Sequence, residues 1–568
     1  MLLAGWLGPA APPVAAQVAG GAAGPPGQVT GNVRLGADPA AARVKDVPGL
    51  AANPADPRHV VAVTVDALNG RCEHHVSFDS GATWTSGLLA GPADFPPPTA
   101  GLPNPLCVAG TAMDGSIAFG SGQRVYTTFA ARRTLTEGFS VLVARSDNGG
   151  RSFSAAAVAL EGGVPNGARF SNPELAVDPQ PQGDRVYVGT IRSAPAPSNV
   201  VVATSPDGGA SWGPAVNASV PTAGAFWEPS TPVVAPGGRV HIAWRNPGTT
   251  GSIGVGTSTD GGATFTPVVA APVMDFPVAG TDSSDPRMAV DPRNGTAYVV
   301  YVAGLGPDPS AAARQDHFIS ANADILAIRS TDGGMTWSPP VRVNDDQRGN
   351  LVSQRQGRVA VAPNGRVDVT WQDRRHGYRS PTNVHLGNGE ARLGDAYYAF
   401  STDGGSSFSP NRRISDRSTN NDVGIDYRAG TYQFFAPTLV PLGNDSVLFA
   451  WMDSREGNFD NDNQDVYVAR FDHRPAAGPL PVRRVEAPDG ASLSVALSKL
   501  GYPGGAEAVT NVGFTSRPAT RLVIVNSADP AAALVGSVLA RAHLGSVLAA
   551  AGGVLTAEQR AEVVRMGP

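Results

Sequence analysis

Ser77-Phe78-Asp79-Ser80-Gly81-Ala82-Thr83-Trp84 is the first of six copies of one octapeptide, Ser-x-Asp-x-Gly-x-x-aromatic, in which the second copy has Asn148 in place of the aspartate. The later copies end at Phe153, Trp212, Phe265, Trp337 and Phe408. The aspartate or asparagine side chain can accept backbone N–H groups of its own turn, glycine allows a positive φ, and the aromatic ring packs back between strands. Each copy follows an alternating or β-branched run, such as 200–204 or 325–329, so the repeated unit is strand, turn, strand.

Successive copies begin 53 to 72 residues apart, and such long and unequal periods suit propeller blades with variable loops. The copies resemble the Asp boxes (BNR repeats) of sialidase-like β-propellers, and the resemblance covers residues 28–475. It implies an all-β propeller. It leaves the activity open, because Asp boxes also occur in propellers without sialidase chemistry.

The number of blades follows from the last repeat unit and the N-terminus. After the sixth box come three strand-like runs, at 436–440, 447–451 and 466–470, with no further box and no outer strand. Residues 32–35 resemble the outer strands expected at 341–343 and 412–414. We therefore predict seven blades closed by an N-terminal strand, which removes the exposed sheet edge, with six blades, as in sialidases, as the alternative.

Composition narrows the partners and the compartment. The formal net charge is −5 and no Lys/Arg-rich run occurs, so we expect no nucleic acid partner. Residues 1–27 are signal-like or disordered and predict a secreted protein, and no apolar run is long enough for a transmembrane segment. In an exported chain the only cysteines, Cys72 and Cys107, are expected to form a disulfide, with two buried free thiols as the alternative. We expect a monomer.

The sequence pattern changes after Pro475. Residues 476–568 read as a small α/β domain, with a buried strand at 521–525 and helices at 530–543 and 556–566. This segment resembles a single type 2 cell-wall-binding repeat, and the resemblance implies an anionic cell-wall polymer as partner and association with the wall. An unrelated small α/β cap is the alternative.

The candidate site lies opposite the boxes. In a four-stranded blade, the loops that enter the first strand and those between the second and third strands gather on the face away from the boxes. A Trp-x-Asp-x-Arg pattern ends two second strands, at 371–375 and 451–455, with a weaker echo at 244–246. The candidate ligand-binding residues are Arg245, Arg287, Arg358, Asp373, Arg375, Asp453 and Arg455. They predict either a pocket for an anionic sugar or salt bridges between blades.

The sialidase resemblance also implies catalytic roles: three arginines around a carboxylate, an aspartate acid/base, and a tyrosine nucleophile assisted by a glutamate. Arg245, Arg287 and Arg358 are the candidate arginines. The other candidates are Tyr427 or Tyr432, Glu174 or Glu228, and Asp285. The Arg-Ile-Pro motif that opens true sialidases is absent from the first unit, which reads Asn53-Pro54-Ala55 at that point.

A metal site is the remaining candidate. Asp460, Asp462 and Asp465 offer closely spaced oxygens suited to Ca²⁺, although they lack EF-hand spacing, and a solvated acidic turn is the alternative. We expect no required cofactor. The leading hypothesis is an exported, envelope-associated propeller that recognises a glycan or other anionic ligand. An exo-α-sialidase-type glycoside hydrolase and a non-catalytic protein-interaction propeller are the alternatives.

Overall fold

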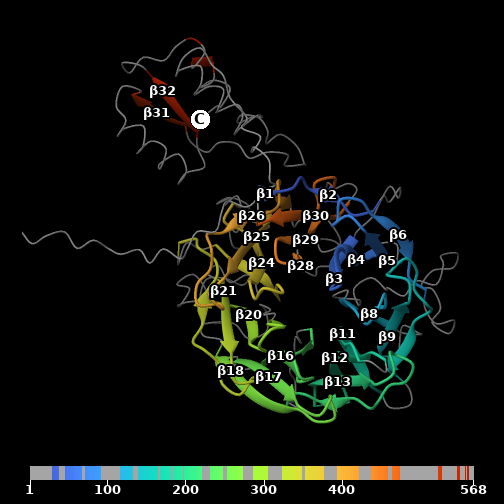
Figure 1. Ribbon diagram of the computed structural model, residues 1–568. Helices are drawn as coiled ribbons and strands as arrows, with labels where there is room; N and C mark the ends of the chain where they lie inside the picture. The colour runs from blue at the N-terminus through green and yellow to red at the C-terminus, as the bar shows by residue number, and fades with distance from the viewer. Residues whose placement is uncertain are drawn as a thin grey trace, which may run out of the picture.

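The computed structural model describes most of residues 28–473 and short stretches near the C-terminus. The described residues are 28–36, 45–66, 71–90, 116–131, 138–163, 167–180, 183–195, 197–220, 231–246, 252–272, 286–304, 323–347, 352–376, 393–420, 437–457, 463–473, 522–526, 546–550, 557 and 560–561. Seven antiparallel sheets of four or five strands stand around a central axis (Figure 1). The prediction of seven blades is confirmed, and the six-bladed alternative is wrong.

We number the blades in chain order. Blade 1 contains β3 (Lys45–Asn53), β4 (Asp56–Asp66), β5 (Arg71–Ser77) and β6 (Thr85–Leu88). Blade 2 contains β7 (Ser116–Phe119), β8 (Val125–Ala131), β9 (Ser140–Ser146) and β10 (Ala157–Leu160). Blade 3 contains β11 (Arg169–Asp178), β12 (Arg185–Ala194), β13 (Asn199–Ser205) and β14 (Val216–Asn217). Blade 4 contains β15 (Val233–Val234), β16 (Val240–Asn246), β17 (Ser252–Ser258) and β18 (Thr266–Pro272).

Blade 5 contains β19 (Arg287–Val290), β20 (Ala297–Gly304), β21 (Ala323–Ser330) and β22 (Val341–Arg342). Blade 6 contains β23 (Gln354–Val361), β24 (Val367–Asp373), β25 (Leu393–Ser401) and β26 (Arg412–Arg413), and β27 (Thr419–Asn420) also pairs with β25. Blade 7 contains β28 (Thr438–Leu442), β29 (Ser446–Asp453) and β30 (Asp465–Asp472). In each blade the first strand in the chain lies nearest the axis, as β3, β11 and β28 show in Figure 1.

The N-terminus closes the ring, as the sequence predicts. Two short strands, β1 (Gln28–Val29) and β2 (Val33–Arg34), both pair antiparallel with β30 of blade 7. The backbone N–H of Leu35 donates to the carbonyl of Val466 at 2.7 Å. The closing segment therefore supplies the outer strand that blade 7 lacks, and it covers the edge of β30.

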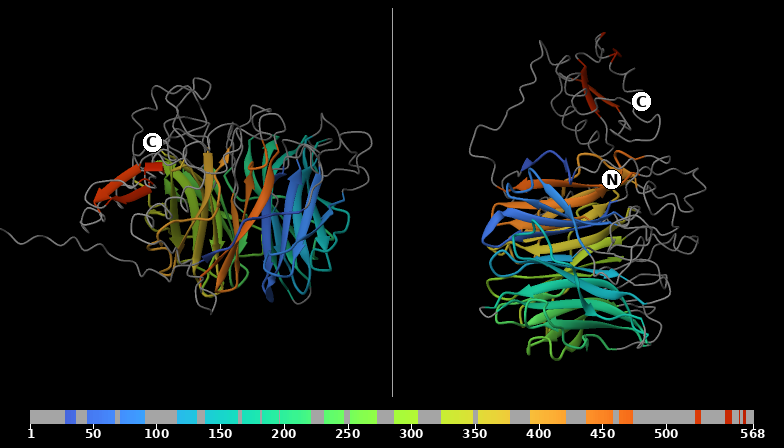
Figure 2. Two further views of the ribbon diagram at one scale, coloured as in Figure 1. Left: turned by 90° about the horizontal axis from the view of Figure 1, so that it is seen from above. Right: turned by 90° about the vertical axis from the view of Figure 1, so that its right-hand side faces the viewer.

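The core is divided among the interfaces between blades. Seven clusters of buried apolar side chains each join two neighbouring blades. The cluster between blades 7 and 1 includes Leu35 of the closing segment, together with Val60 and Leu448. Central strands such as β13 are buried at nearly every position because both of their faces are covered. Figure 2 shows these strands side by side, viewed from the edge of the ring.

Each Asp box is a closed hydrogen-bonded turn. In the first box the Ser77 hydroxyl donates to Asp79 Oδ1 at 2.8 Å, and the Gly81 N–H donates to the same hydroxyl at 2.9 Å. The Thr83 N–H and hydroxyl donate to the two oxygens of Asp79, at 2.9 and 2.6 Å. The boxes with Asp207, Asp260, Asp332 and Asp403 repeat this pattern. In the second box Asn148 keeps the geometry, but its amide donates to Ser152 at 2.8 Å.

The boxes also hold neighbouring blades together. In most boxes the second glycine packs against the second strand of the preceding blade, as Gly262 does against Tyr187 and Gly334 against His241, whereas Gly209 of the third box has open space around it. A Cβ on Gly262 would lie 2.5 Å from the hydroxyl of Thr204, so a side chain has no room there. Glycine is required at this position for two reasons: φ is positive, and the preceding blade approaches the backbone closely.

The C-terminal segment is described only in part. Strand β31 (Leu522–Asn526) pairs in parallel with β32 (Ser546–Ala550), and parallel neighbours need a crossover connection. The predicted strand at 521–525 is therefore present, whereas the helix at 530–543 lies outside the described residues. Resemblance to a cell-wall-binding repeat stays a prediction. None of the described helical residues belongs to a helix long and apolar enough to cross a membrane.

Candidate functional site

The boxes and the first hairpin of each blade lie at the same end of the propeller, as predicted. The N–H of Gly208, in the third box, donates at 2.8 Å to the carbonyl of Asp184, in the first hairpin of the same blade. A cavity of about 310 Å³ lies at this end between blades 5 and 6. Two of its three arginines form ion pairs with carboxylates, Arg293 with Asp291 and Arg366 with Asp368, both at 2.7 Å. The paired charges at this end of the propeller are typical of scaffold, which leaves the opposite end as the candidate binding face.

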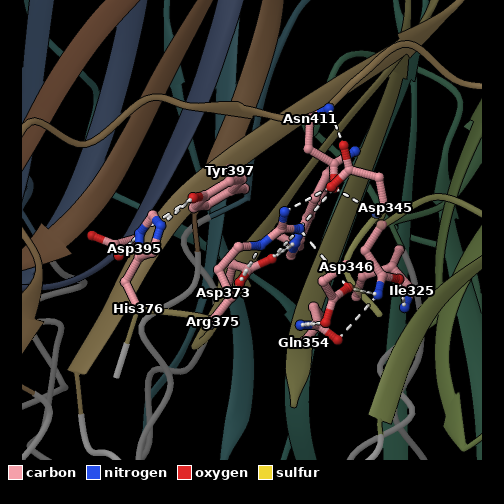
Figure 3. Close-up of polar contacts among 12 residues, drawn as sticks. Ile325, Asp345, Asp346, Gln354, Asp373, Arg375, His376, Asp395, Tyr397 and Asn411 are labelled. Atoms are coloured by element: carbon pink, nitrogen blue, oxygen red, sulfur yellow. Dashed lines mark hydrogen bonds and ion pairs between the residues drawn. The ribbon is translucent and has the colours of Figure 1, made fainter. Parts of the chain in front are cut away.

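At the opposite end, the Trp-x-Asp-x-Arg pattern of blade 6 forms one bonded unit, and Figure 3 shows Asp373 and Arg375 of this unit. The indole N–H of Trp371 donates to Asp373 Oδ2 at 2.9 Å. Arg375 donates to both oxygens of Asp373, at 3.0 and 2.9 Å, and its Nη1 donates to Asp345 Oδ1 at 2.6 Å. The guanidinium also lies over the ring of Tyr397, 4.5 Å from its centroid. Arg375 thus joins β24 of blade 6 to the segment that follows the outer strand of blade 5.

Blade 7 repeats the same unit. Trp451 donates to Asp453 Oδ2 at 3.1 Å, and Arg455 Nη2 donates to the same oxygen at 2.7 Å. The Arg455 guanidinium also reaches Asp416 of the preceding blade at 2.8 Å and lies over the ring of Tyr467. Of the two interpretations of these residues, the contacts favour salt bridges between blades.

Burial shifts the pKa of both the aspartate and the arginine in each of these pairs. Burial raises the pKa of Asp373, and the guanidinium of Arg375 opposes that shift without cancelling it. Burial lowers the pKa of Arg375, but Asp373 raises it further, so the net shift is upward and the arginine stays charged. Removing one partner would leave a buried, uncompensated charge, which is costly. Asp373, Arg375, Asp453 and Arg455 are therefore already engaged within the protein.

The partial Trp motif of blade 4, at residues 244–246, has an asparagine at the position of the motif's aspartate. Trp244 donates to Asn246 Oδ1 at 2.7 Å, so a neutral amide stands where blades 6 and 7 have a carboxylate. Arg245 lies between them on β16 and is half-buried, with its Nε shielded from solvent. Across the described ranges, Arg245 forms neither a hydrogen bond nor an ion pair. Ala243, two residues earlier, packs in the cluster between blades 4 and 5, so by alternation Arg245 faces blade 5.

Three predicted residues occupy equivalent positions on inner strands. Each of them pairs with a residue of the second strand of its blade. In all three blades, that second-strand residue lies three positions after the one that pairs with the serine of the Asp box. These residues are Glu174 in blade 3, Arg287 in blade 5 and Arg358 in blade 6. Glu174 is buried and accepts a hydrogen bond at 2.8 Å from the hydroxyl of Thr231, which precedes the inner strand of blade 4. Arg287 is 6% exposed.

The inner strands also contain a feature that the sequence did not reveal. β11 and β23 each shift register just before the equivalent position, between Ser171 and Glu174 and between Arg355 and Arg358. Within these bulges Asn172 has φ 52° and Gln356 has φ 54°. Asn-Pro at 172–173 is a weak signal of irregular backbone, whereas nothing around Gln356 predicts its conformation.

A buried lysine was also missed. Lys45 begins β3, is 2% exposed, and its Nζ contacts the carboxylate of Glu73. His75 Nε2 lies 3.7 Å from the same carboxylate, and the Lys45 backbone N–H donates to Gln464 of blade 7 at 2.8 Å. The backbone hydrogen bond to Gln464 joins blade 1 to blade 7, and the side-chain contacts lie within blade 1. We therefore assign this cluster a structural role.

Several predicted residues lie outside the described residues: Tyr427, Tyr432, Glu228, Asp285, Asp460, Asp462 and Cys107. Cys72 is buried in β5. Its disulfide with Cys107 stays a prediction because Cys107 lies outside the described residues. Asp465 is buried, and Arg34 lies 3.7 Å from it. The described part of the chain contains no group of three or more His, Cys, Asp or Glu residues that could hold a metal ion. The Ca²⁺ site also stays a prediction.

The geometry supports binding of an anion more than any single reaction. Arg245, Arg287 and Arg358 come from three consecutive blades, all near the end opposite the boxes. Arginine presents several donors in a planar fork that matches a carboxylate. The three arginines thus lie toward the same end of blades 4, 5 and 6, and Glu174 lies in the neighbouring blade 3.

Comparison with known proteins agrees with the repeat. A family model described as "BNR/Asp-box repeat" matches residues 328–339. Among curated proteins, none matches the chain.

Three solved structures illustrate the similarity that was found. A protein of unknown function from Dyadobacter fermentans is 16% identical over 63% of this chain and 94% of its own, with a TM-score of 0.39. The Hadza microbial sialidase Hz136 is 13% identical over 62% and 64%, with a TM-score of 0.39. An α-L-arabinofuranosidase from Fusarium graminearum is 12% identical over 78% and 97%, with a TM-score of 0.40.

These values transfer no activity, and the fold rests on the strand pairing itself. Seven antiparallel blades, six hydrogen-bonded boxes and an N-terminal closing segment are present in one ring. The chain is a seven-bladed β-propeller that carries Asp-box repeats.

Proposed function

We propose that this propeller binds an acidic glycan on the face opposite the boxes, through arginines of blades 4, 5 and 6. The proposed ligand is a sugar that carries a carboxylate, held in part by Arg245. Arg287 and Arg358, on the inner strands of the next two blades, would contribute positive potential or direct contacts. The acidic sugar would belong to an envelope or extracellular glycan.

One observation carries this proposal: Arg245, the residue after Trp244, forms neither a hydrogen bond nor an ion pair with any described residue. Arg375 and Arg455 meet the carboxylates of their own motifs at 2.9 and 2.7 Å, whereas Trp244 holds Asn246 instead. A half-buried guanidinium without a compensating anion costs free energy. A ligand carboxylate would remove this cost by supplying the missing anion, in a bidentate geometry that arginine favours.

Calorimetric titration of the full-length chain with three probes tests the proposal. The probes are 3′-sialyllactose, trigalacturonic acid and neutral lactose. We expect at least one acidic probe to bind and lactose to fail, with affinity falling as NaCl is raised, because salt screens charge–charge attraction. Absence of binding by both acidic probes would overturn the proposal.

Hydrolysis is a second candidate because Glu174 places a buried carboxylate at the same level as Arg287 and Arg358. A sialidase needs a glutamate beside its tyrosine nucleophile. A fluorogenic sialoside distinguishes the two functions. Turnover that is lost in Tyr427→Phe or Tyr432→Phe would make the protein a hydrolase, whereas binding of 3′-sialyllactose without turnover would leave it a lectin-like propeller.

The envelope location is proposed from the signal-like N-terminus and the C-terminal segment. Co-sedimentation of the full-length chain with purified bacterial cell walls tests this part alone. We expect the chain to pellet with walls and to be released by added polyanionic wall polymer. A chain that stays in the supernatant would contradict wall association without affecting the glycan site.

A further inference from the structure

Three residues other than glycine have a left-handed backbone within the described ranges: Ser80, Asn172 and Gln356. Ser80 lies in the first Asp box, at a turn position where the other five boxes have glycine, and is explained by the turn. Asn172 and Gln356 lie instead on inner strands, at points where the strand shifts register. A side chain at φ near +50° costs about 1–2 kcal/mol relative to the right-handed region, so these two positions need a reason.

The two residues are structurally equivalent. Each lies two positions before an equivalent inner-strand residue, Asn172 before Glu174 and Gln356 before Arg358. In each case a bulge places two residues opposite one on the second strand, opposite Thr190 in blade 3 and Trp371 in blade 6. A bulge turns a side chain out of the normal alternation, and such bulges are frequent beside active sites.

The bulges lie toward the proposed binding face. β11 begins at Arg169 and β23 at Gln354, and both strands start at the end opposite the boxes. Inner strands are also the strands nearest the axis, as Figure 1 shows for β11. Asn172 and Gln356 therefore stand near the axial end of two non-adjacent blades, with blades 4 and 5 between them.

Their side chains are chemically alike, and neither carboxamide oxygen accepts a hydrogen bond from a described residue. Gln356 is 4% exposed, yet its Oε1 accepts no hydrogen bond within the described part of the chain. Asn172 is half-buried, and its side chain forms no hydrogen bond to any described residue. Buried polar atoms are nearly always satisfied, so an orphan carboxamide oxygen indicates a missing donor, such as water or a ligand hydroxyl.

We infer that Asn172 and Gln356 determine the specificity of the acidic-glycan site by bonding neutral hydroxyl or amide groups of the sugar. This inference rests on the proposed function. The arginines bind the carboxylate of the sugar, and the two carboxamides form hydrogen bonds with its uncharged hydroxyl or amide groups. A carboxamide offers both a donor and an acceptor, as a sugar hydroxyl does. The backbone strain fixes each carboxamide at one place before the ligand arrives.

Glycine substitution separates this role from a structural one. Gln356→Gly and Asn172→Gly keep the left-handed backbone without strain and delete the side chain that ends in the carboxamide. Both variants should unfold at or slightly above the temperature of the unaltered chain, because glycine adopts this conformation freely. Their affinity for 3′-sialyllactose or trigalacturonic acid should fall by about three- to ten-fold, the range expected for one lost neutral hydrogen bond.

Two further variants complete the test. Ser80→Gly is the matched control: it makes the same backbone change in a box at the other face and should leave affinity unchanged. Gln356→Asn retains a carboxamide and should recover part of the affinity that Gln356→Gly loses. Unchanged affinity in both glycine variants, while the unaltered chain binds, would overturn this inference and leave the proposed function intact. Failure of the unaltered chain to bind either acidic probe would overturn both.

Discussion

Leu35→Ala should weaken the closure of the ring. Leu35 follows β2, is 1% exposed, and packs between blades 7 and 1. Loss of a buried leucine side chain costs about 2–4 kcal/mol of unfolding free energy when a cavity remains. The backbone bond from Leu35 to Val466 should persist, so the loss reports on side-chain packing of the closing segment.

Val33→Ala is the matched control, because Val33 lies in the same short strand but is 40% exposed. It should cost about 0.5 kcal/mol or less. Urea unfolding followed by tryptophan fluorescence measures both variants, with the loss taken from the fall in midpoint at unchanged slope. Equal small losses in the two variants would refute the claim that the N-terminal segment closes the ring through buried contacts.

Three further predictions concern the scaffold. Gly262→Ala should cost about 2–4 kcal/mol of unfolding free energy, because φ is +88° and the new Cβ would lie 2.5 Å from the Thr204 hydroxyl. Gly209→Ala is the control: φ is +87° but the space around it is open, so it should cost only about 1–2 kcal/mol. Equal losses in the two variants would contradict close packing of the box against the preceding blade. Burial lowers the pKa of His241 to about 4, so the unfolded chain takes up a proton that the folded chain refuses. Unfolding free energy should therefore fall as pH drops from about 6.5 to 4, by roughly 3 kcal/mol from this residue, and His241→Gln measured at both pH values should lack that share. Asp373→Asn should cost about 3 kcal/mol in urea unfolding, because it leaves the Arg375 guanidinium undercompensated in a partly buried place; a loss below about 1 kcal/mol would mean that the pair is unimportant.

The fold was readable from sequence because its signals are local and repeated. Each box contains all the side chains that bond its own turn, so the octapeptide alone specifies the hairpin. The closing strand was found because residues 32–35 resemble other outer strands, although the structure divides the N-terminal pairing between β1 and β2. The Trp-Asp-Arg units were also readable, since their bonds join residues two positions apart.

The site was less readable because its chemistry depends on what surrounds each side chain. From the sequence, Arg245, Arg375 and Arg455 are equal candidates for ligand binding, and only the contacts distinguish Arg375 and Arg455, which are paired with aspartates, from Arg245. The left-handed backbone of Gln356 arises from a bulge against β24, which depends on pairing of distant segments. A local pattern cannot report such a tertiary effect.

The central claim is that Arg245 holds a ligand carboxylate on the face opposite the boxes. The direct measurement is the dissociation constant of the acidic probe that binds, 3′-sialyllactose or trigalacturonic acid, for Arg245→Ala and for Arg293→Ala. Arg293 is a box-face arginine already paired with Asp291, so it controls for loss of one positive charge. We predict that Arg245→Ala weakens binding by about ten-fold or more, since a charge-assisted bond is worth about 1.5–3 kcal/mol, while Arg293→Ala leaves it unchanged. Equal affinity of the two variants would contradict the account.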